Sequence, residues 1–90
     1  MSVEDNLTNV AVRRILTSLW VDITLVNVRT ADGVVYLSGH LQRMTASHRD
    51  FHETTLRELD LRVRRVPCVQ DVKYQLDNWE RKLTAHWAPR

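Results

Sequence analysis

The clearest alternation of apolar and polar positions runs from Val26 to Leu41, on both sides of the pair Asp32-Gly33. An aspartate followed by a glycine between two apolar runs is typical of a tight hairpin turn, because glycine takes positive φ without a steric penalty. The alternation before and after this pair predicts two strands. The faces of the second strand carry Val35, Leu37, Gly39 and Leu41 on one side and Val34, Tyr36, Ser38 and His40 on the other.

Apolar residues recur at spacings of three and four in two further segments, at about 3–20 and about 48–65, and predict two amphipathic helices. The β-branched run from Ile23 to Val28 then begins the first strand. Pro67 ends the second helix, because proline lacks the amide hydrogen and disfavours helical geometry at the preceding residue. The stripes expected to face the core are Leu7, Val10, Ala11, Ile15, Leu16 and Leu19 in the first helix, and His52, Leu56, Leu59, Val63 and Val66 in the second.

A third strand follows Val69, where Val72, Tyr74 and Leu76 alternate with polar residues. The order predicts an α+β fold of the form αββαβ, with two helices packed on one face of a small three-stranded sheet, because each helix has one apolar stripe to cover. Gly39 should then face the helices, and Gly39→Val should destabilise the domain. The face left open to solvent carries Asn27, Arg29, Tyr36, Ser38, His40, Lys73 and Gln75.

Composition agrees with one small globular domain. The chain has 90 residues, of which 43% are hydrophobic and 27% charged, with a net charge of +2 and one cysteine. No apolar run approaches the roughly 18 residues that span a bilayer, and the first ten residues do not resemble a secretory signal. We therefore expect a cytoplasmic protein without a transmembrane segment.

The run from Asp32 to Gly39 and the later run from Val66 to Val72 resemble the BON domain, a small bacterial module. The resemblance covers about residues 5–78, so we expect a BON-like domain at 1–78 and a tryptophan-containing C-terminal tail at 79–90. It implies non-catalytic binding of a protein partner or of an anionic phospholipid surface, without a cofactor. The chain departs from the family at Cys68, where a glycine is usual, so the helix should end there without the freedom of positive φ.

Basic residues gather at the end of the second helix and are candidate contacts to an anionic surface. The alternative interpretation is a solvated helix face, because Glu53, Glu58 and Asp60 lie among them. The candidates are Arg57, Arg62, Arg64 and Arg65.

The tail has Trp79, Leu83 and Trp87 at spacings of four, which predicts one apolar stripe on a short helix. Such a stripe packs on its own domain, on a partner or across a homodimer, and truncation after Asn78 should leave a folded domain. The candidate partner contacts are Tyr36, His40, Lys73, Trp79, Leu83 and Trp87.

Catalytic and metal-binding residues are not predicted. His48 and His52 are four residues apart, but no third ligand accompanies them, and Cys68 has no base beside it. We therefore predict that the chain is not an enzyme. A small nucleic-acid-binding domain is the alternative function, suggested by net charge and size, although the two isolated glycines cannot form a phosphate clamp. A protein partner is favoured over lipid, because no lipidation signal is present.

Overall fold

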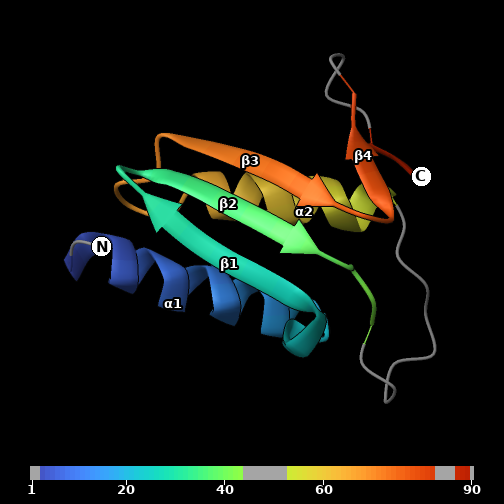
Figure 1. The fold of residues 1–90 in the computed structure, drawn as a ribbon, viewed down its shortest axis with the longest axis horizontal. Coiled ribbons are helices and arrows are strands. Elements are labelled where there is room, and N and C mark those ends of the chain that lie inside the picture. Colours follow the sequence, from blue (N-terminus) through green and yellow to red (C-terminus); the bar gives the residue numbers. More distant parts are fainter. Residues whose placement is uncertain (1–2, 44–52, 83–86, 90) are drawn as a thin grey trace.

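The computed structural model is an α+β fold in which two helices accompany a three-stranded sheet and a small C-terminal hairpin (Figure 1). It describes residues 3–43, 53–82 and 87–89. The predicted α+β class is confirmed, and the C-terminal hairpin is an addition to the prediction. In chain order the elements are α1 (Val3–Ser18), the 3-10 turn η1 (Ile23–Leu25), β1 (Val26–Ala31), β2 (Val34–Gly39), α2 (Glu53–Arg64), β3 (Asp71–Leu76), β4 (Trp79–Arg81) and β5 (Trp87–Pro89).

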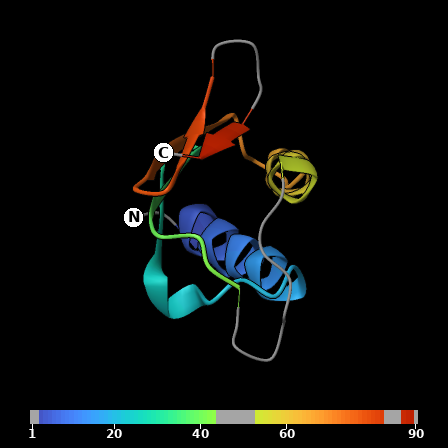
Figure 2. The ribbon, with the colours of Figure 1, turned by 90° about the vertical axis from the view of Figure 1, so that its right-hand side faces the viewer.

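The main sheet has the order β1-β2-β3. Strands β1 and β2 pair antiparallel across a turn in which Asp32 and Gly33 both have positive φ, as a two-residue hairpin turn of type I′ requires. Strand β3 pairs with β2 in parallel, so the chain between them crosses over, and α2 lies in that connection. Helix α1 packs beside β1 and α2 beside β3, and the two helices also contact each other (Figure 2).

The strands bury alternate residues, as the sequence pattern predicts. Val28 of β1 pairs with Leu37 of β2, and both are buried, whereas the flanking Asn27 and Arg29 are exposed. The apolar core is therefore continuous from the sheet to the helices. Its buried members are Val12, Leu16, Val21, Val28, Val35, Leu37, Leu41, Leu56, Leu59, Val63, Val72, Leu76 and Trp87.

Helix α1 presents only part of its predicted stripe to the core: Leu16 is buried, and Ile15 and Leu19 pack against the core. Leu7 and Val10 are 64% and 46% exposed, whereas Asp5, Thr8 and Asn9 are buried with Val12 and Leu16. A polar contact accounts for this orientation, because the buried hydroxyl of Thr30 in β1 donates a 2.7 Å hydrogen bond to Oδ1 of Asn9. The prediction that Leu7 and Val10 face the core is therefore wrong.

The segment between α1 and β1 also differs from the prediction. Helix α1 ends in a Schellman motif, in which Val21 N donates to Leu16 O at 3.0 Å and Trp20 has φ +63°. Ile23 then lies in η1 and not in a strand. The reason is local: Oδ1 of Asp22 accepts hydrogen bonds from the backbone and the hydroxyl of Thr24, at 3.0 and 2.6 Å.

Two residues with positive φ correct further expectations. Gly39 has φ +106°, and an added Cβ would overlap the carbonyl oxygen of Leu25, so backbone and not a helix fills the space beside it. Cys68 has φ +71°, so the chain takes the left-handed conformation at this position without a glycine.

The C-terminal residues form a hairpin, so the predicted helical stripe is wrong. Strand β4 pairs antiparallel with β5, with Arg81 opposite Trp87. Trp87 is only 5% exposed and belongs to the core. The side chain of Asn78, just before β4, donates to Leu41 O at 2.8 Å and accepts from Leu41 N at 3.1 Å, which ties this end of the chain to the segment after β2.

Candidate functional site

The outward side of α1 carries three exposed apolar side chains. Val3, Leu7 and Val10 are 74%, 64% and 46% exposed, and their spacing of four and three residues places them on one side of the helix. Arg14 follows on the same side and Arg13 beside it, and both are exposed. We call these five residues the α1 outer face.

Two hollows flank this face. One, of about 270 Å³, lies between α1 and the loop before β3, and Leu7, Ala11 and Pro67 contribute to its lining. The other, of about 440 Å³, is lined by Val10, Arg13, Arg14, Thr17 and Ser18. Each hollow therefore lies beside one of the exposed apolar side chains, Leu7 or Val10.

The charges of Arg13 and Arg14 are available to a partner. Within the described part of the chain, neither side chain lies within 4.0 Å of a carboxylate. Exposed cations beside apolar side chains favour a ligand that is apolar with acidic groups nearby.

The arginines at the end of α2 were predicted to contact an anionic surface. Most of them form ion pairs within the domain. Arg57 contacts Glu53 at 2.9 Å, and Arg62 contacts Glu58 at 2.8 Å. Arg64 contacts Asp60 at 3.0 Å and Asp71 at 3.3 Å. Arg65 is exposed and has no such pair with a described residue. These carboxylates weaken the field that an anionic ligand would meet at α2.

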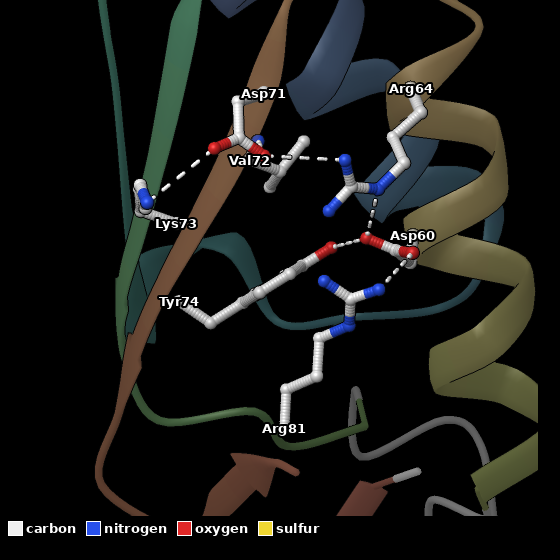
Figure 3. Close-up of polar contacts among 7 residues, drawn as sticks. All are labelled: Asp60, Arg64, Asp71, Val72, Lys73, Tyr74 and Arg81. Carbon is white, nitrogen blue, oxygen red and sulfur yellow. Dashed lines mark hydrogen bonds and ion pairs between the residues drawn. The ribbon is translucent and has the colours of Figure 1, made fainter. Parts of the chain in front are cut away.

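Asp60 is the centre of a polar cluster that joins α2 to β3 and β4 (Figure 3). Its carboxylate accepts a 2.5 Å hydrogen bond from the hydroxyl of Tyr74 and contacts Arg64 and, at 3.6 Å, Arg81. Burial, followed by the hydrogen bond to Asp60, raises the pKa of Tyr74 well above its ordinary value. The cluster is a structural link between elements, because Asp60 of α2 contacts both Tyr74 of β3 and Arg81 of β4.

Of the candidate partner contacts predicted from the sequence, Tyr36 and Lys73 lie side by side on β2 and β3, whereas the buried Trp87 belongs to no surface. Tyr36 lies on the open sheet face with Arg29 over its ring at 5.3 Å, and Lys73 contacts Asp71 at 3.5 Å. Nδ1 of His40 lies 2.9 Å from Asp77. Trp79 is partly buried against the core, Trp87 is buried, and Leu83 lies outside the described residues.

Among residues 3–43, 53–82 and 87–89, no three histidine, cysteine or acidic side chains are grouped to hold a metal ion. His48 and His52 lie outside these ranges. Cys68 is exposed. None of the helices in the described ranges has the length and apolar character to cross a membrane.

Comparison with known proteins adds no relative: the sequence matches no protein-family model and no curated protein. The evidence for a site is therefore the geometry of α1. Sequence reasoning missed this face because it assigned Leu7 and Val10 to the core. The side chains of Thr8 and Asn9, which are buried on the opposite side, are polar and so gave no apolar signal for the correct orientation.

Proposed function

We propose that this chain is a non-catalytic interaction module of the BON type, an αββαβ domain with both helices on one sheet face, and that it binds a protein partner through the α1 outer face. The observation that carries the proposal is the exposure of Val3, Leu7 and Val10 on one side of α1. Burying a large aliphatic side chain contributes about 1.5–3 kcal/mol, so a complementary surface would gain affinity here.

The shape of the face supports a protein over a lipid surface. The hollows beside Leu7 and Val10 can receive side chains of a partner, and a folded partner supplies side chains at fixed positions. An anionic membrane would use Arg13 and Arg14 but would leave the hollows unfilled. Lipid binding and nucleic-acid binding are therefore alternative outcomes of the test.

Site-specific photo-crosslinking tests this proposal. A photoreactive amino acid replaces Val10 in the full chain, and the matched control places it at Asn27, which is exposed on β1. Irradiation in the native cells should give a discrete protein adduct from position 10 and none from position 27. The absence of a protein adduct at position 10, or adducts to lipid or nucleic acid alone, would overturn the proposal.

A further inference from the structure

We infer that the protein bound by the α1 outer face is a second copy of this chain, with the two α1 helices packed antiparallel about a twofold axis. This inference rests on the proposed function and names its partner. A twofold interface uses the same patch on both copies, so the patch must complement itself. The α1 outer face meets this requirement in shape and in charge.

The shape argument follows from residue positions. In an antiparallel pair centred at the level of residue 9, position 7 lies opposite position 11, and position 3 lies opposite position 15. The protruding Leu7 then meets the hollow that Ala11 and Pro67 line. Val3, which is 74% exposed, meets the hollow beside Arg14. Each copy thus places an apolar side chain in both hollows of the other.

The charge argument uses the same alignment. Glu4 and Arg14 are both exposed, lie near opposite ends of α1, and have no ion pair with a described residue. Antiparallel packing about residue 9 brings Glu4 of each copy beside Arg14 of the other, which forms two symmetric ion pairs. A parallel pair would place like charges side by side.

The expected dimer is weak. Helix α1 has 16 residues and is about 24 Å long, so one helix pair forms a small interface. Association should therefore depend on protein concentration and, because of the ion pairs, weaken as salt rises.

Charge reversal tests the pairing directly by sedimentation equilibrium. Glu4→Arg alone opposes Arg14 with another cation, and Arg14→Glu alone opposes Glu4 with another anion, so each variant should dimerise at least tenfold more weakly than the wild type. An equimolar mixture of the two variants restores both ion pairs and should recover the wild-type association. Lys73→Glu, on the exposed sheet face, is the matched control and should not change it.

A monomeric wild type at all accessible concentrations would overturn the inference, as would full dimerisation of either single variant or no recovery in the mixture. Circular dichroism of each variant separates these results from misfolding. The inference can fail while the proposed function stands: position 10 would then crosslink to a different protein, and the purified chain would be monomeric.

Discussion

The indole of Trp87 meets the ring of Tyr74 edge to face, with ring centroids 4.6 Å apart and planes at 83°. This contact joins β5 to β3, and the backbone amide of Trp87 also donates to Oε1 of Glu53 in α2 at 3.4 Å. Aromatic pairs of this geometry contribute about 0.5–1.5 kcal/mol beyond the area that they bury. The C-terminal hairpin is thus part of the folded unit.

Trp87→Ala should lower the free energy of unfolding by about 3–5 kcal/mol, because it removes a buried aromatic side chain and leaves a cavity. Urea unfolding followed by circular dichroism measures this. Trp20→Ala is the control, since Trp20 is 55% exposed and should change stability by no more than about 0.5 kcal/mol. Equal effects of the two substitutions would contradict the position of Trp87.

Truncation after Asn78 should also destabilise the domain, in contrast to the expectation from sequence. It removes Trp87 from the core and breaks the ion pair between Arg81 and Asp60. The truncated chain should unfold at clearly lower urea than the full chain. An unchanged unfolding midpoint would show that the hairpin contributes nothing to the core.

Cys68→Gly should stabilise the protein by about 0.5–1 kcal/mol. The backbone at Cys68 has φ +71°, where a side chain costs about 1–2 kcal/mol, and the added freedom of glycine in the unfolded chain offsets part of the gain. Thermal unfolding of Cys68→Ala is the control, because alanine keeps Cβ and removes only the thiol. Stabilisation by alanine as large as that by glycine would assign the effect to the thiol and not to the backbone.

Gly39→Ala should destabilise the protein by at least about 1–3 kcal/mol, because even one added carbon would overlap the carbonyl of Leu25 at φ +106°. Ser38→Ala, one residue earlier in β2, is the matched control. The sequence-based explanation, a side chain that displaces a helix, would instead predict that valine is much worse than alanine. Similar unfolding midpoints for Gly39→Ala and Gly39→Val would support the backbone overlap.

Tyr74 should make stability fall at alkaline pH. Its pKa is raised in the folded state, so the stability from the neutral phenol is complete below about pH 10, the ordinary tyrosine value, and is lost as pH rises above it. Tyr74→Phe should lower the free energy of unfolding near pH 7, because the hydrogen bond to Asp60 is lost. Above pH 10, the free energy of unfolding of this variant should decrease less steeply with pH than that of the wild type. Tyr36→Phe is the control. An alkaline slope identical in Tyr74→Phe and wild type would contradict this assignment.

The strands could be predicted from the sequence because their alternation is local, and the Asp32-Gly33 turn fixes the register of β1 against β2. The orientation of α1 could not be predicted in the same way. Counting apolar residues gave weight to Leu7 and Val10, whereas the contact that orients the helix joins Asn9 to Thr30, which lies 21 residues away. A pattern of apolar residues cannot reveal a buried pair of polar residues.

The prediction of a helix in the C-terminal tail is wrong for a related reason. The spacing of Trp79 and Trp87 fits a helix, but the contacts of Trp87 with Tyr74 and Glu53 come from distant segments and outweigh the weak helical preference of a short segment. The candidate site was missed as a consequence of the first error, because residues assigned to the core cannot be considered as a surface.

The side chain of Asn78 contacts both backbone groups of Leu41, as a residue of a neighbouring strand would. The amide of Leu41, although it follows the end of β2, is therefore closed off from solvent in the same manner as the sheet. Its hydrogen should exchange with deuterium only when the sheet opens, at the rate of the β2 amides and not of a loop. The cooperative unit of unfolding thus extends beyond the last residue of β2. In Asn78→Ala, the amide hydrogen of Leu41 should exchange faster than those of β2.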